Sequence, residues 1–397
     1  MTSRERFLNR INGKPVDRTP FFPDLTKWYE HMRYGDGERD RSFLPGGIIW
    51  PDEPLHNLPG IMPERYRDLD FLGVHRAIDC GMPVHGYHIF FNTNIDESVQ
   101  FAKEQADRQI TTTVTTPVGT LREVRTLNAT HNWTVTEHMV KSHDDFKVIE
   151  YVTEHTESTP DYEPVKKALE MIGDQGYLNL IIPRSPMGRM IHNYAGLLPM
   201  TYAIADAPDR GTLLDTLGAP DAVRKLLEAI TEKDRELWKI AAEAPGKIAF
   251  MADNMDEFLI SPVWYRDYFL PVYQEMNAVL HAGGKKVLTH MDGRLKNIFP
   301  MIPDSGFDVL DGCCPAPMCD YEPKELAAAL GEGQTAYCGV PASYFIPGAS
   351  HEKILDFAKK ILDEMGERVI LNVADVLPAE ADIETVEKMA ELVKSYG

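Results

Sequence analysis

The sequence contains no apolar run that approaches the ~20 residues needed to span a bilayer. Residues 1–8 are rich in charge and have no apolar stretch of the kind that marks a signal peptide. Basic side chains are also in deficit, because 41 Lys and Arg stand against 61 Asp and Glu and give a formal net charge of −20. A surface of this sign repels phosphate backbones and anionic lipid, so we expect no nucleic-acid partner and no membrane partner.

Cysteine is scarce, and its five copies lack the spacing of a disulfide framework. We therefore expect reduced thiols and a cytoplasmic location. Cys313, Cys314 and Cys319 lie in one segment and Cys338 follows it; the simplest interpretation of any one of them is a small buried apolar side chain. A G-x-G-x-x-G turn after an early strand is missing too, which disfavours a doubly wound nucleotide-binding sheet.

From residue 247 onward, short apolar runs alternate with longer amphipathic stretches. The runs that we interpret as strands are 248–252, 286–290, 307–310, 335–338 and 368–372. The stretches that we interpret as helices are 261–282, 295–302, 322–330, 351–365 and 383–396. Strands that are apolar on both faces and separated by helices are typical of a parallel sheet covered by helices. This pattern predicts an α/β fold, a (β/α)8 TIM barrel.

The first half of the chain is less regular. Residues 19–24 and 177–182 supply two further barrel strands, and 109–115 pairs with 121–127 as a β-hairpin. Further strands are predicted at 133–136 and 148–152. We interpret residues 95–160 as an antiparallel insertion within a single barrel domain that spans residues 1–397.

In a barrel of this kind, residues just past the carboxyl end of each strand face the active site. His290 and Asp292 stand two apart on an extended segment, so both side chains point the same way. Together with the thiolate of Cys338 they form a candidate zinc site. The alternative is a hydrogen-bonded His–Asp pair that shapes the barrel mouth without a metal.

Other polar residues follow the predicted strands. Asp253 and Asp375 are candidate general acids, with helix capping and a solvated loop carboxylate as the alternatives. Arg184 is a candidate clamp for a substrate carboxylate, or the partner of one of these aspartates. The remaining candidate substrate-binding residues are Asp24, Asn254 and Tyr344. Tyr344 belongs to an aromatic and methionine set that lines a pocket or, alternatively, packs in the core.

Several segments resemble the uroporphyrinogen decarboxylase superfamily, which includes the cobalamin-dependent methyltransferases. They are TSRERF (2–7), GKPVDRTP (13–20), LISP (259–262), YFLP (268–271), AGGKKV (282–287) with His290, YCGV (337–340), and ILN (370–372) with LP (377–378). The resemblance covers nearly the whole chain and implies the barrel fold. It is less specific for the reaction.

The departures from the family pattern narrow the function. Uroporphyrinogen decarboxylases carry an arginine-rich N-terminal motif, whereas residues 21–28 read FFPDLTKW. Thiol-methylating members hold zinc with H-x-C and a later cysteine, whereas this chain has Asp292 and Asp375 in the corresponding places. Because fewer thiolates make a zinc ion harder, the resemblance implies an oxygen substrate. We therefore expect methyl transfer from a methyl ether, of the aryl class, to the cobalt of a corrinoid protein.

Three rival interpretations stay open at the level of sequence. The first is a decarboxylase of a smaller substrate, in which Asp253 or Asp24 stabilises a protonated intermediate. The second is a methylcobamide:thiol methyltransferase, and the third is a non-catalytic corrinoid-binding subunit. The sequence also leaves open whether the chain forms a homodimer.

Overall fold

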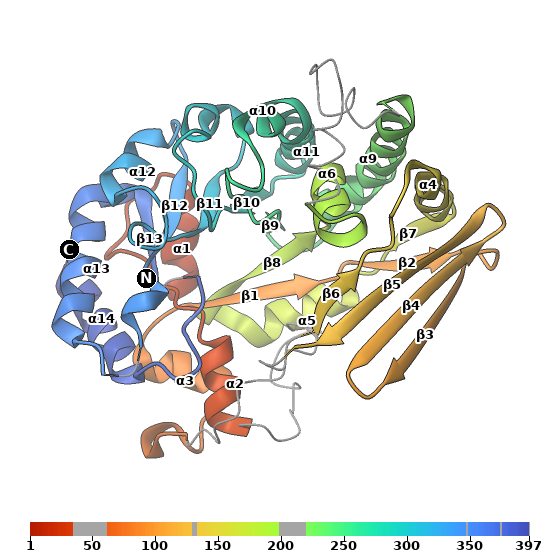
Figure 1. The fold of residues 1–397 in the computed structure, drawn as a ribbon. Coiled ribbons are helices and arrows are strands. Elements are labelled where there is room, and N and C mark those ends of the chain that lie inside the picture. Colours follow the sequence, from red (N-terminus) through yellow and green to blue (C-terminus); the bar gives the residue numbers. More distant parts are fainter. Residues whose placement is uncertain (35–61, 129–132, 198–219, 347, 374, 397) are drawn as a thin grey trace.

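The computed structural model describes residues 1–34, 62–128, 133–197, 220–346, 348–373 and 375–396. Its centre is a curled parallel sheet of seven strands in the order β1-β8-β9-β10-β11-β12-β13 (Figure 1). The strands are β1 (Met82–Tyr87), β8 (Gly176–Ile182), β9 (Ile248–Met251), β10 (Lys286–His290), β11 (Val309–Cys313), β12 (Thr335–Val340) and β13 (Val369–Val373). Five of these seven strands coincide with the regular strand-and-helix pattern after residue 247.

The N-terminal segment closes this sheet into a barrel. Phe21 forms a parallel bridge with Leu371 of β13. On its other side, the amide of Gly81, which precedes β1, donates a hydrogen bond of 2.8 Å to the carbonyl oxygen of Phe21. The segment around Phe21 therefore occupies the first strand position between β13 and β1. The (β/α)8 barrel that the sequence predicts is confirmed.

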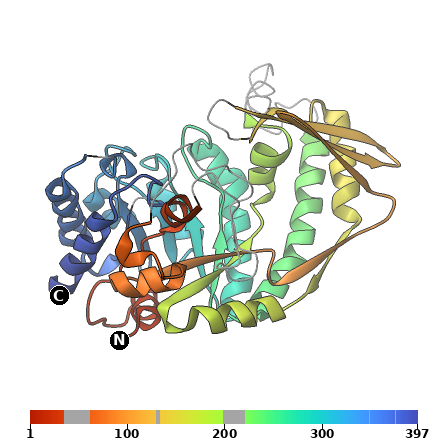
Figure 2. The same cartoon turned by 90° about the horizontal axis from the view of Figure 1, so that it is seen from below.

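Helices surround the barrel. They are α2 (Thr26–Tyr34), α3 (Phe71–Ile78), α5 (Glu163–Ile172), α6 (Pro186–Arg189), α9 (Pro220–Glu243), α10 (Pro262–Trp264), α11 (Leu270–Ala282), α12 (Pro323–Ala329), α13 (His351–Met365) and α14 (Ile383–Ser395). Viewed from below, the C-terminal helices, coloured blue, lie on the side opposite the orange and brown antiparallel strands (Figure 2). Within the described ranges, no helix has both the length and the apolar character that a membrane crossing requires.

Helix α1 (Ser3–Ile11) closes the amino-terminal end of the barrel. Its Phe7 stacks on Tyr177 of β8 with ring centroids 3.7 Å apart, and Ile11 packs in the same interior cluster. The helix begins with a capping box between Thr2 and Glu5. With this end filled by side chains, the opening of the barrel is left at the carboxyl ends of its strands.

An antiparallel insertion extends from the barrel next to β1 and β8 (Figure 1). It contains the pair β2 (Phe91–Ile95) and β7 (Thr156–Pro160), and a sheet of β3 (Gln100–Ala106), β4 (Gln109–Thr116), β5 (Gly119–Leu127) and β6 (Trp133–Glu137). The predicted hairpin is confirmed by the pairing of β4 with β5. The strand predicted at 148–152 is wrong, because this segment lies in helix α4 (Phe146–Glu154). Its apolar residues recur with helical spacing and bury one face of α4.

Two of the predicted helices differ from the structure in form or in extent. The long helix predicted at 261–282 is present as α10, the π-helical turn η7 (Tyr265–Phe269) and α11. The helix predicted at 295–302 is wrong, because the structure has only the 3₁₀ turns η8 (Phe299–Met301) and η9 (Pro303–Ser305) there. Pro300 and Pro303 lack the amide hydrogens that an α-helix would need at these positions.

Candidate active site

A cavity of about 610 Å³ lies at the carboxyl ends of the barrel strands. Most of its lining is polar or aromatic. The lining residues of these two kinds are Asp24, Lys27, His85, Tyr87, His88, Arg184, Arg189, Asn193, Tyr194, Phe250, Asn254, His290, Asp311, Tyr337 and Asp375. A cavity of this size and mixed character suits a small organic ligand held by a few polar groups.

The two-residue period of the strands determines which side chains reach this cavity. Leu288 of β10 and Val309 of β11 belong to the apolar cluster inside the barrel. His290 and Asp311 follow two positions later and therefore point to the same, inner side, nearer the mouth. The interior thus changes from apolar at its base to ionisable at its open end.

His290 lies at the centre of a group of carboxylates. Its Nδ1 is 3.0 Å from Asp311 Oδ2, and its Nε2 is 3.5 Å from Asp292 Oδ2 and 3.8 Å from Asp375 Oδ1. Burial by itself lowers the pKa of His290, but Asp375, Asp292 and Asp311 together raise it well above its ordinary value. The Nδ1–H of His290 donates to Asp311, which leaves Nε2 directed toward the other two carboxylates.

Three of these residues meet the requirements of a metal site. His290, Asp311 and Asp375 each offer a ligand atom, and these atoms all lie within 4.8 Å of one another. A nitrogen and carboxylate oxygens are ligands that Zn²⁺ accepts. Burial, with the nearby carboxylates of Asp311 and Asp292, raises the pKa of Asp375, while His290 opposes this change. A bound cation would relieve the repulsion between these carboxylates.

A second histidine–aspartate pair faces the same cavity. His85 Nε2 of β1 is 3.7 Å from Asp24 Oδ2, and its Nδ1 lies 3.2 Å from the side-chain amide group of Asn179. Burial lowers the pKa of His85, but Asp24 outweighs this effect and raises it above the ordinary value. Burial raises the pKa of Asp24, but the nearby His85 and a hydrogen bond from the backbone amide of Thr26 outweigh this effect and hold it below its ordinary value. The pair is therefore suited to hold a proton on His85.

The neighbouring strand β8 contributes a guanidinium group. Arg184 follows β8, and its Nη1 donates to the backbone carbonyl of Ala252 and, at 3.1 Å, to Asn254 Oδ1. Asn254 adopts a left-handed backbone conformation with φ of 50°, which aims its side chain at Arg184. Arg184 and Asn254, two of the four residues predicted to bind substrate, thus line the cavity and contact each other.

Aromatic rings form much of the remaining wall. Phe250 of β9 lies between the two histidines, with ring centroids 5.6 Å from His85 and 6.1 Å from His290. Tyr87, Tyr194 and Tyr337 also line the cavity. Flat apolar faces of this kind favour a planar ring in the ligand.

The placement predicted for Asp253 is wrong. This residue is fully buried outside the cavity, where Oδ1 accepts from the backbone amide of Ser185 at 3.0 Å and Oδ2 accepts from the Tyr273 hydroxyl at 2.7 Å. The reason is the alternation along β9, in which Phe250 and Asn254 face inward and Asp253 faces the helices. Asp253 anchors the start of α6 to α11.

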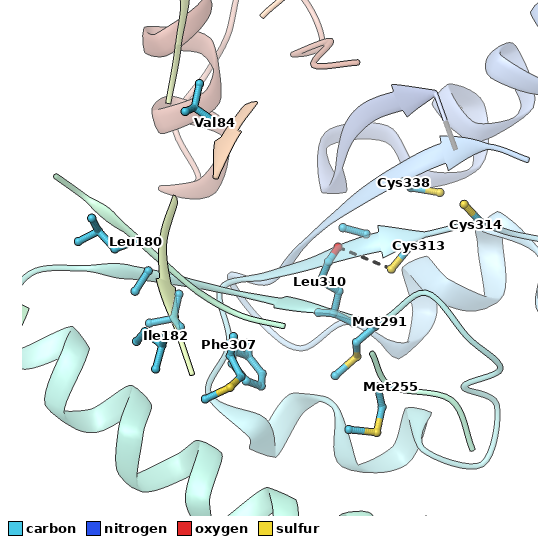
Figure 3. Packing of buried hydrophobic residues seen from close by; sticks show 14 of the residues in the cluster. Val84, Leu180, Ile182, Met255, Met291, Phe307, Leu310, Cys313, Cys314 and Cys338 are labelled. Atoms are coloured by element: carbon cyan, nitrogen blue, oxygen red, sulfur yellow. Dashed lines mark hydrogen bonds between the residues drawn. The ribbon is translucent and has the colours of Figure 1, made fainter. Parts of the chain in front are cut away.

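Cys338 and Tyr344 are also absent from the cavity lining. Cys338 is fully buried between β12 and the helices, near Cys313 and Cys314 (Figure 3), because its neighbour Tyr337 occupies the inner face of the strand. The prediction that Cys338 is a thiolate ligand of the metal site is therefore wrong. Tyr344 lies in the turn η10 (Ala342–Tyr344) and packs against Phe357 of α13, away from the cavity lining where the sequence predicts it.

The structure brings together the other candidates and adds residues that the sequence reasoning missed. Asp24, Asp375 and His290 line the cavity, and Asp292 contacts His290 beside it. The missed residues are His85, Tyr87 and Asp311. Each is a polar side chain in a strand whose other residues are mostly buried. A polar residue in a strand that is buried on both faces indicates a position on the inner face of the barrel near its mouth.

Comparisons with known proteins found one family match and several similar structures. Residues 200–396 match the family model described as uroporphyrinogen decarboxylase (URO-D). A methyltransferase from Methanosarcina mazei has a similar structure, with a TM-score of 0.58, 15% identity, and coverage of 100% of this chain and 99% of that one. A B12-independent methionine synthase from Shewanella sp. W3-18-1 gives a TM-score of 0.40 at 10% identity, over 96% of this chain and 97% of the other. No curated protein matches the sequence.

Proposed function

We propose that this chain, whose residues 200–396 match the uroporphyrinogen decarboxylase (URO-D) family model, is a methyltransferase. Its methyl donor is a methyl ether, of the aryl class, and the acceptor is the cobalt of a corrinoid carried by a partner protein. One observation carries the proposal: an aromatic-walled cavity in which His290 is surrounded by Asp292, Asp311 and Asp375. Protonated His290, or a cation held by His290 and these carboxylates, can stabilise negative charge on an ether oxygen as its methyl group leaves.

The ligand set supports zinc as the resident metal. His290 and Asp375 would hold the ion, with Asp311 or Asp292 as a further carboxylate ligand. When bound, zinc supplies a Lewis acid for the oxygen that loses its methyl group. Because no described cysteine lines the cavity, this site is harder than one built from thiolates. That difference favours an oxygen substrate over methylation of a thiol.

Residues of the chain itself supply the proton for the leaving oxygen and orient the substrate. Methyl transfer breaks the bond between the methyl carbon and the ether oxygen, and the oxygen keeps the electron pair. His85 donates a proton to this oxygen, and Asp24 keeps His85 protonated and oriented. Phe250 and Tyr87 hold the ring of the substrate, which leaves the methyl group directed toward the open mouth.

A decarboxylase of a small aromatic acid is the second candidate, and one observation favours it. Arg184 offers a cationic group to an acidic substrate in the same cavity. In that reaction His85 would protonate the carbon that loses carbon dioxide, and no corrinoid would take part.

Two assays separate these functions. The protein is mixed with methoxylated aromatic compounds and cob(I)alamin, and absorbance spectra follow the formation of methylcobalamin while chromatography follows the phenol. We expect both products in equal amounts, and their loss in His290→Ala. Release of carbon dioxide without any corrinoid, and no methylcobalamin, would instead establish the decarboxylase.

A further inference from the structure

The guanidinium of Arg184 has one edge that the protein does not use. Nη1 carries two hydrogens, and its two acceptors are the Ala252 carbonyl and Asn254 Oδ1. Within the described part of the chain, Nε and Nη2 make no hydrogen bond and no carboxylate forms an ion pair with Arg184. The Nε–Nη2 edge is one of the two edges that bind a carboxylate with two parallel hydrogen bonds.

Arg184 is fixed before any ligand arrives. Its two acceptors both belong to the segment that follows β9, and Asn254 holds its unusual backbone conformation there. A guanidinium that is already oriented loses less freedom on binding than a flexible lysine would. The free edge is therefore a prepared site for an anion.

The neighbouring strands add to this cationic side. Arg189 of α6 lines the same cavity, and its Nη2 pairs with the buried carboxylate of Asp234 while its buried Nε has no partner among the described residues. Asn193 of the π-helical turn η6 (Met190–Tyr194) lines the cavity beside it. All three residues follow β8, the third strand of the barrel.

The acidic groups come from other strands than β8. Asp375 follows β13, the last strand, and Asp24 follows the first strand position, whereas Asp311 is on β11. The positive charges of Arg184 and Arg189 thus lie after the third strand, whereas His290, Asp311 and Asp375 come from the fifth, sixth and eighth strands. A ligand that spans the cavity meets opposite electrostatic environments at its two ends.

We infer that the substrate carries a carboxylate, which the free edge of Arg184 binds while the reacting oxygen lies near His290 and His85. This inference rests on the proposed function, which it deepens by naming the substrate class: an aromatic acid with a methoxy substituent on its ring. The ring lies against Phe250 between the two ends. The chain's net charge of −20 makes non-specific binding of an acid unfavourable, so uptake of one requires such a local cationic site.

Calorimetric titration with matched ligands tests the inference. The ligands are 3- and 4-methoxybenzoate and the corresponding methoxybenzamides, which have the same shape but no charge. We expect the acids to bind about tenfold or more tightly than the amides. In Arg184→Gln this preference disappears because the acids weaken and the amides do not, and Arg184→Lys recovers only part of it.

The control is Arg266→Gln, which removes the same charge from an exposed residue that pairs with Asp267. This variant keeps the preference for acids. Equal binding of acids and amides by the unmodified protein, failure of both to bind, or an equal loss of both in Arg184→Gln would overturn the inference. The methyl-transfer assay is interpreted separately. If acids bind through Arg184 but no methylcobalamin forms, the carboxylate site is supported and the proposed methyltransferase activity is rejected.

Discussion

A histidine next to a carboxylate keeps its proton to a higher pH than a histidine in water. His85 has Asp24 on one ring nitrogen and Asn179 on the other, and Asp24 raises its pKa against the effect of burial. As the proposed proton donor, His85 is active only in its protonated form. Activity should therefore persist to a pH above the ordinary range of histidine and fall as the pH rises through the raised pKa.

Asp24→Asn tests this dependence. The substitution removes the charge that stabilises protonated His85, so the alkaline limb of kcat/KM should move to lower pH. Asp24 is not among the candidate zinc ligands, so zinc content should stay unchanged and serves as the control. A pH profile that keeps its alkaline limb in Asp24→Asn would show that His85 is not the group that titrates.

For individual residues, the sequence predicted where the strands end but not the direction in which each side chain points. Strands that are buried on both faces have no alternation between apolar and polar residues, so the inner face cannot be recognised from hydrophobicity. For this reason Cys338 was expected at the mouth where Tyr337 lies, and Asp253 was expected where Asn254 lies. Asp311 was missed because its segment was expected to end at residue 310.

Among the elements, strand β11 has a feature that bears directly on the site. Its pairing with β12 shifts between Leu310 and Cys313, and Gly312 adopts φ of 73° within this irregular stretch. A Cβ atom at Gly312 would lie 2.5 Å from Cε1 and 2.7 Å from Nδ1 of His290. The irregular strand therefore gives the imidazole the space that it occupies.

Gly312→Ala should displace His290 and also strain the backbone of β11. We expect zinc affinity and methyl transfer to fall by about tenfold or more, and the free energy of unfolding to fall by about 1–3 kcal/mol. Metal titration and thermal denaturation measure the two effects. Gly333→Ala, at φ of 75° with open space around it, carries the same backbone strain away from the site and should lose stability alone. Normal zinc binding in Gly312→Ala would contradict this account of the strand.

The regular second half of the chain was predictable because each helix there has its own start and stop signals. Helix α13, for example, begins after the N-cap Ser350 and ends at Gly366, as its sequence indicates. Local patterns failed where other features competed, as in α4, whose β-branched residues suggested a strand, and at Pro300 and Pro303. The first barrel strand was found only as a segment, because its pairing with β13 joins residues about 350 positions apart.

For the whole molecule, the acidic surface should oppose the approach of the acidic substrate that we infer. Salt screens long-range repulsion more than it weakens a partly buried contact such as that with Arg184. We therefore expect the association rate of methoxybenzoate to rise severalfold between about 20 and 200 mM NaCl, while that of methoxybenzamide stays constant. Stopped-flow fluorescence measures both rates. A rate for the acid that falls with salt would indicate attraction rather than repulsion.

The central claim is that strands from across the whole barrel bring His290 and Asp375 into one metal-binding centre, and zinc binding tests it most directly. Zinc content and affinity are measured for the unmodified protein, His290→Ala, Asp375→Ala and, as the matched control, Cys338→Ala. The account predicts about one zinc ion per chain in the unmodified protein and in Cys338→Ala, and its loss in the other two variants. Stoichiometric zinc in His290→Ala, or loss of zinc only in Cys338→Ala, would contradict it.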